Sequence, residues 1–179
     1  MPAAAVATYL GNSVGQQFLW EASKTRLLND CLSAPPVARP AYSLSCYELP
    51  FYAARQTGVT DLACDAVAQG LFALMQGRPV PATAFVGGLR SYNNYGLWQY
   101  IWWQNLPLAG DFVFFSGPGA KYMAHVAIAT GVGYDTVSFG HNGLGGGGAQ
   151  ALQVANLTVA QIFALNPQLT SAHFFTPTW

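Results

Sequence analysis

Residues 110–140 decide the fold, and their sequence is GDFVFFSGPGAKYMAHVAIATGVGYDTVSFG. Three short apolar runs lie in it, at 111–116, 124–131 and 135–140, and glycines bound them. Runs of this length between turn residues are typical of buried strands. The links between the runs are short and contain glycine, which favours antiparallel neighbours. We therefore predict a small antiparallel sheet in the second half of the chain.

Helical patterns dominate the first half of the chain. Prolines at 35, 36 and 40 forbid a helix there and predict an extended connector over 34–40. We expect serines to cap the helix that contains Cys46, and Thr60 and Thr158 to begin two others. The expected helices cover residues 13–32, 46–57, 60–76, 94–105 and 158–165, and a last strand covers 172–175. Helices followed by strands predict the α+β class.

Length and composition narrow the functional classes. A chain of 179 residues fits one domain, which we expect to consist of a helical N-terminal extension and proline-rich connector (1–40) and a core (41–179). Hydrophobic residues make up 52% and charged residues 8%, with seven cations and seven anions. So few cations argue against nucleic-acid binding. The apolar content argues against disorder, and no apolar run reaches the ~18–20 residues of a membrane span.

Cysteine usage and the N-terminus bear on the compartment. The three cysteines, Cys31, Cys46 and Cys64, allow at most one disulfide, and no spacing suggests a zinc site. The first residues lack the basic and long apolar regions of a cleavable signal peptide. We therefore expect a protein delivered by a signal-independent route, or otherwise a cytoplasmic one.

Cys46 and His125 are the candidate nucleophile and base. A cysteine at a helix N-terminus meets positive dipole charge and free N–H groups, which stabilise a thiolate and a developing oxyanion. The base has to be histidine, and His125 begins a predicted strand. His141, at the end of the next strand, or the neighbouring Asn142 could orient it. His173 and the buried-type thiol Cys64 are expected to be structural.

Two carboxylates lie near these elements. Asp111, at the entrance of the first strand, is expected to hydrogen-bond backbone groups. Glu48 lies in the first turn of the helix after Cys46, where it favours the helix dipole but would oppose a thiolate. We expect it to cap that helix.

The order of these motifs resembles the NlpC-type peptidases of the papain-like superfamily. The matching pattern is Cys46 at a helix start, the Gly110-Asp111 strand, the His125-Val-Ala-Ile strand and a polar residue on the strand after it. It covers about residues 43–142. The resemblance implies a papain-like fold with N-terminal helices packed on a small antiparallel sheet. It also implies a catalytic Cys46, His125 and His141, with Ser138 or Asn142 as the alternative third member.

The resemblance implies a cysteine-dependent amide hydrolase that needs no metal or organic cofactor. Peptidoglycan stem peptides are the first expected substrate, although Ser45, Tyr47 and Glu48 replace the Asp and the Ser-Gly that usually flank the cysteine. Parts of the sequence also resemble toxin domains of secreted bacterial effectors, which implies an immunity protein as a partner. Tyr47, Trp98 and Trp102 are candidates for a substrate groove.

Two other functions are open, one of which uses the same residues in catalysis and one of which does not. A deamidase or an acyl-transferring toxin, such as a transglutaminase, would use the same Cys-His pair on a protein or lipid of a target cell. A non-catalytic binding module would keep the fold alone.

Overall fold

The computed structural model describes residues 2–20, 43–93, 106–140 and 150–179. Along the chain the elements are α1 (Pro2–Asn12), β1 (Gln17–Trp20), β2 (Ser43–Leu44), α3 (Glu48–Gln56), α4 (Asp61–Met75), β3 (Phe85–Asn93), β4 (Phe112–Gly117), β5 (Ala120–Ala129), β6 (Asp135–Ser138), β7 (Gln150–Gln153), β8 (Ala155–Thr158), α5 (Val159–Leu165) and β9 (Ser171–Pro177). Helices and an antiparallel sheet together confirm the α+β class.

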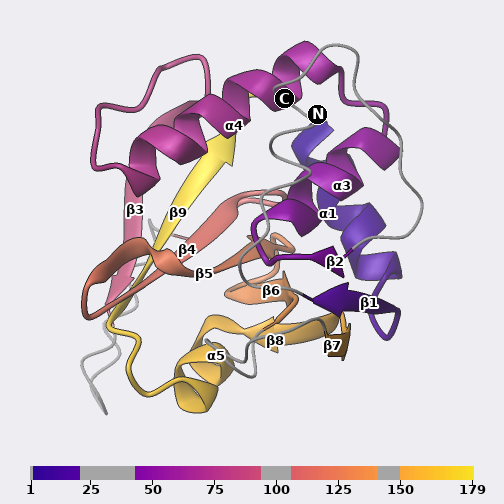
Figure 1. Ribbon diagram of the computed structural model, residues 1–179, viewed down its shortest axis with the longest axis vertical. Helices are drawn as coiled ribbons and strands as arrows, with labels where there is room; N and C mark the ends of the chain where they lie inside the picture. The colour runs from indigo at the N-terminus through magenta and orange to yellow at the C-terminus, as the bar shows by residue number, and fades with distance from the viewer. Residues whose placement is uncertain (1, 21–42, 94–105, 141–149) are drawn as a thin grey trace.

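A six-stranded sheet forms the centre of the molecule, with the order β3-β9-β4-β5-β6-β8 (Figure 1). Its neighbouring strands are all antiparallel. The three apolar runs become β4, β5 and β6, and the last predicted strand becomes β9, so these predictions are confirmed. The β4–β5 register sets Phe115 opposite His125, and β6 follows on the other side of β5.

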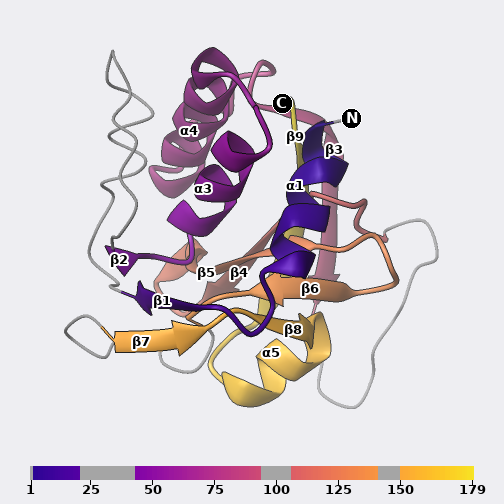
Figure 2. The ribbon, with the colours of Figure 1, turned by 90° about the vertical axis from the view of Figure 1, so that its right-hand side faces the viewer.

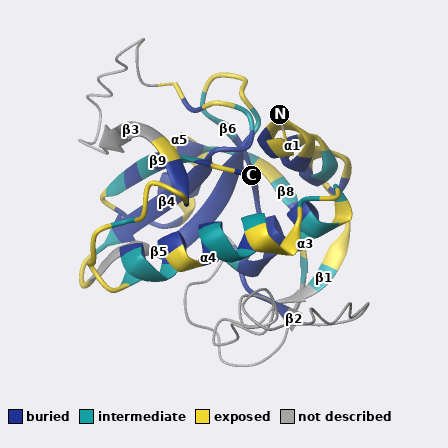
Figure 3. Cartoon of the chain, turned by 90° about the horizontal axis from the view of Figure 1, so that it is seen from above, coloured by how far each residue is buried: buried dark blue, intermediate teal, exposed yellow. Residues whose placement is uncertain are grey.

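Alternation along the strands gives the sheet two apolar faces. Phe112 and Phe114 of β4 face a first core shared with α1, α3 and α4. Val113 and Phe115 face a second core, shared with α5. Figure 2 shows the three helices on one side of the sheet and α5 on the other. Figure 3 shows β4 buried between these layers, while α4 exposes one side.

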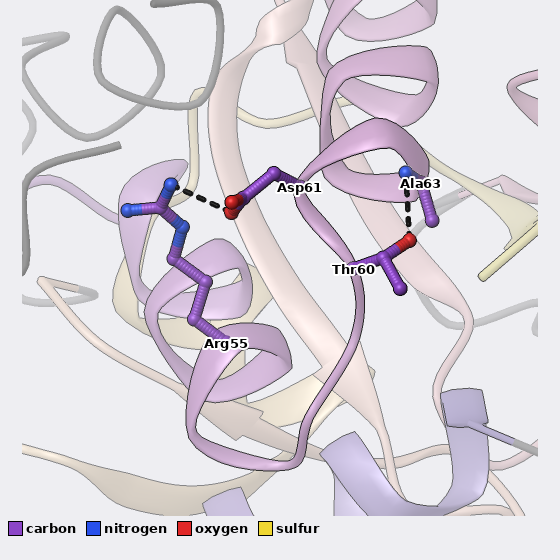
Figure 4. Close-up of polar contacts among 4 residues, drawn as sticks. All are labelled: Arg55, Thr60, Asp61 and Ala63. Atoms are coloured by element: carbon purple, nitrogen blue, oxygen red, sulfur yellow. Dashed lines mark hydrogen bonds and ion pairs between the residues drawn. The ribbon is translucent and has the colours of Figure 1, made fainter. Parts of the chain in front are cut away.

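The α3–α4 corner follows the signals that the sequence carries. The Thr60 hydroxyl accepts a hydrogen bond from Ala63 N at 3.3 Å and begins α4, as predicted (Figure 4). Arg55, near the end of α3, forms an ion pair with Asp61 at 2.9 Å across the corner. Thr158 caps α5 with a capping box that includes Gln161, which confirms the predicted helix start.

The prediction of a helix over 13–32 is wrong for its first part. Residues 17–20 form β1, which pairs with β7 antiparallel and with β2 in parallel, and the helix lies earlier, at α1. The backbone pairing on both sides overrides a short apolar pattern that fits either structure. Residues 21–32 and the helix predicted at 94–105 lie outside the described residues.

α1 is part of the helical layer. Its Val6 and Leu10 are fully buried in the first core, and α1 packs beside α3 (Figure 2). Alanine has the highest helix propensity, and four of the first seven residues are alanine. Among the described residues, no helix combines the length and hydrophobicity that crossing a membrane requires.

Candidate active site

Cys46 lies in the turn that leads into α3. Glu48 N and Leu49 N both donate to Ser45 O, at 3.1 and 3.3 Å, so helical hydrogen bonding extends back to Ser45. The Glu48 carboxylate in turn accepts from Ser45 N at 2.7 Å. This return bond is one half of a capping box, and the expected serine side-chain cap is replaced by the glutamate. Tyr47, at the N-cap position, makes no side-chain capping bond.

Three backbone N–H groups donate hydrogen bonds toward the Cys46 sulfur. They belong to Val126, to Cys46 itself and to Tyr47. The thiol is free and only 7% exposed. The pKa of Cys46 is raised to about 11, chiefly by burial and to a lesser extent by the charge of Glu48, while the three N–H groups act in the opposite direction. The Cys46 thiol is therefore protonated at neutral pH.

His125 lies in the middle of β5, with its ring buried in the sheet. The prediction that it begins the strand is wrong, because pairing continues to Gly117 and Ala120 at the turn and the strand begins at Ala120. Its exposed fraction is 1%, and the ring stacks at a tilt on Phe115, 5.6 Å between centroids. Nε2 lies 2.7 Å from the Ser138 hydroxyl oxygen, on β6. Ser138 is fully buried as well. The hydroxyl can accept from an Nε2–H or donate to a bare Nε2, so this bond holds the orientation of the imidazole in either tautomer.

The thiol and the imidazole approach β5 from different sides. α3 packs with Val126 and Ile128 in the first core, whereas the His125 ring contacts Phe115, which belongs to the second. The N–H of Val126 lies in the plane of the sheet, between these two faces. A sulfur that accepts from this group is at the level of the β5 backbone, one residue along from His125. The site is thus centred on the β5 backbone at residues 125 and 126.

The structure places three of the residues singled out in the sequence around residues 125 and 126 of β5: the Cys46 sulfur is near the N–H of Val126, and His125 contacts Ser138. Ser138 is the one that contacts the His125 ring, through Nε2. Tyr47 adjoins them, half-buried, and burial raises the pKa of its phenol. The remaining candidates, His141, Asn142, Trp98 and Trp102, lie outside the described residues.

The other polar candidates have the structural contacts expected of them. The Asp111 carboxylate accepts from Leu108 N at 2.6 Å and from the Thr176 hydroxyl at 2.5 Å. His173 lies in β9, with Nε2 2.9 Å from the Ser171 hydroxyl oxygen. Cys64 is a fully buried thiol in α4 that forms no disulfide.

One functional group escaped the sequence analysis, namely the backbone N–H of Val126. A backbone donor leaves no side-chain signal, and only the packing of α3 against β5 brings it to Cys46. Among the described residues, no three His, Cys, Asp or Glu side chains are grouped so as to hold a metal ion. Comparison with protein-family models, curated proteins and solved structures finds no match to this chain.

Proposed function

We propose that the protein is a cysteine-dependent amide hydrolase with a papain-like, NlpC-type site. Cys46 is the nucleophile, His125 the base and Ser138 the residue that orients His125. The observation that carries the proposal is the position of the Cys46 sulfur, which accepts a hydrogen bond from the N–H of the residue next to His125. The Nε2–Ser138 bond supplies the third contact that such a site requires.

The protonated resting thiol defines the role of His125. Because the pKa of Cys46 is raised to about 11, sulfur attack requires a base that accepts its proton in the same step. With Nε2 bonded to Ser138, the proton goes to Nδ1. The sulfur bonds to the amide carbonyl carbon, and His125 then gives the proton to the departing amine. Water hydrolyses the resulting thioester and restores the thiol.

Backbone N–H groups also support the stabilisation of the negative charge that develops on the substrate carbonyl oxygen. The donors from Cys46 and Tyr47 lie at the N-terminal turn of α3, where the helix dipole is positive. As the sulfur forms its bond to carbon, the carbonyl oxygen becomes negative beside these donors. An oxyanion there gains the stabilisation that N–H groups provide in acyl transfer.

The substrate class that this chemistry favours is a peptide or isopeptide amide. Bacterial cell-wall stem peptides come first because of the sequence resemblance, and delivery as an effector with an immunity protein as partner belongs to the same proposal. Low charge, 8% of residues, disfavours recognition by long-range attraction. We expect binding through uncharged and aromatic contacts.

Mass spectrometry of the reaction products tests the proposal. Purified peptidoglycan and candidate proteins are incubated with the wild type, with Cys46→Ala and with Cys64→Ala. Cys64 is the matched control, because it is also a buried thiol outside any disulfide but lies within a helix. New stem-peptide fragments with wild type and Cys64→Ala alone support hydrolysis. Conversion of Gln to Glu, or a new cross-link, assigns a deamidase or transferase, and full biological activity of Cys46→Ala excludes all three reactions.

A further inference from the structure

Glu48 is a buried carboxylate beside the proposed nucleophile. Its exposed fraction is 0%, although α3 is a helix on the outer layer of the fold. Glutamate is rarely buried so completely unless its carboxylate is paired or hydrogen-bonded. Within the part of the chain that the structure describes, Asp111 is the other acidic side chain with no exposed surface, so Glu48 has one natural comparison.

The hydrogen bond of Glu48 determines the shape of the nucleophile's turn. Its Oε2 accepts from Ser45 N at 2.7 Å, while its own N–H donates to Ser45 O at 3.1 Å. These two bonds close a ring through Cys46 and Tyr47. The N–H groups of the two enclosed residues are the ones that reach the Cys46 sulfur. Glu48 therefore holds the geometry that presents two of the three donors to the thiol.

The charge of Glu48 acts on the same sulfur in the opposite sense. Its coulombic effect raises the pKa of Cys46, in addition to the larger effect of burial. Among the described residues, Tyr47 lies on the same turn, and His125 precedes Val126, whose N–H is near the sulfur. Neither is negatively charged at neutral pH, so within the described part of the chain Glu48 is the anion that a thiolate at this position would meet.

We propose that Glu48 is the positioning residue of the nucleophile, which holds the Cys46 turn through Ser45 N and whose negative charge opposes a thiolate there. This inference rests on the proposed function, since it describes the regulation of that nucleophile. A site built in this way keeps the thiol protonated and unreactive until His125 takes its proton. Neutralising the side chain while keeping its acceptor oxygen separates the two effects of Glu48.

The test measures site-resolved alkylation of Cys46 by iodoacetamide in the intact protein between pH 6 and 10. Peptide mass spectrometry reports Cys46 and Cys64 separately, and their ratio corrects for general opening of the fold because both thiols are buried. Glu48→Gln is compared with the wild type and with Asp111→Asn. The control removes the other buried carboxylate, which also accepts from a backbone N–H.

The expected result is an about three- to tenfold higher Cys46/Cys64 ratio at pH 7 in Glu48→Gln, because loss of the negative charge lowers the pKa of Cys46. Asp111→Asn leaves the ratio at the wild-type value. An unchanged or lower ratio in Glu48→Gln overturns the inference. Alkylation needs no substrate, so this outcome is distinct from failure of the proposed function, which His125→Ala tests by the same assay.

Discussion

At the scale of single residues, the Ser138 hydroxyl occupies the place that a charged or amide orienter could have filled. It contacts Nε2 of His125 at 2.7 Å and is fully buried. A hydroxyl can hold the orientation of an imidazole, but it brings no negative charge to stabilise an imidazolium. We therefore expect its contribution to come from geometry and one hydrogen bond.

Ser138→Ala removes that hydrogen bond. A bond to a charged group contributes about 1.5–3 kcal/mol, so kcat should fall about ten- to a hundredfold when His125 becomes charged in the reaction, with KM little changed. Ser13→Ala is the control, because Ser13 is also a buried serine but donates to Tyr9 O in α1. Equal kinetic losses in the two variants would contradict an orienting role for Ser138.

The buried thiol makes stability depend on alkaline pH. The pKa of Cys46 is about 11 in the fold, against 9.0 for an ordinary cysteine, so above pH 9 the unfolded chain loses the proton first. Stability is therefore full below pH 9 and declines as the pH rises through 11. In urea unfolding under reducing conditions, the free energy of unfolding of the wild type should fall by about 1 kcal/mol more than that of Cys46→Ala between pH 8 and 10. Equal losses of stability in the two proteins would mean that Cys46 has the pKa of an ordinary thiol in the fold.

At the scale of elements, the site depends on how closely α1 and α3 approach the sheet. Gly110, just before β4, has a φ of +88°, and a Cβ there would lie 2.1 Å from the carbonyl oxygen of Ala3 in α1. The first core joins α1 and α3 to the same strands. A shift of α1 therefore disturbs the layer that carries the Cys46 turn.

Gly110→Ala tests this close approach. The left-handed backbone alone costs about 1–2 kcal/mol for a residue with a side chain, and displacement of the α1 backbone adds to this. Gly58→Ala is the control, because its φ is +82° and a Cβ there would meet nothing within 4 Å. In denaturant unfolding, Gly110→Ala should lower the free energy of unfolding by about 1 kcal/mol or more beyond the loss in Gly58→Ala. This is about half the cost of truncating a buried apolar side chain. Equal losses would show that α1 accommodates the methyl group.

At the scale of the whole molecule, local sequence signals predicted most elements but not their partners. The glycine-bounded apolar runs gave β4 to β6, and threonine caps gave the starts of α4 and α5. β1 was missed because four residues, Gln17–Trp20, become a strand only through pairing with β2 and β7. Pairing between residues this far apart in the chain has no local signature.

The candidate site, too, could be predicted only in part from the sequence. Cys46 and His125 could be predicted because their residue types and their places at a helix start and on a strand carry the signal. The contact between Ser138 and His125 could not, since it depends on the β5–β6 register, in which Ala127 pairs with Ser138. The burial that raises the pKa of Cys46 was also hidden, because it arises from packing α3 against the sheet.

The central claim is that Cys46 and His125 act as a pair, and alkylation of Cys46 at pH 7 in His125→Ala tests it most directly. His173→Ala is the matched control, since His173 is also a strand histidine bonded through Nε2 to a serine hydroxyl. A base that takes the thiol proton contributes about a hundredfold or more to such a reaction. The account predicts that Cys46 labelling, relative to Cys64, is lost in His125→Ala and kept in His173→Ala. Undiminished labelling in His125→Ala would contradict it.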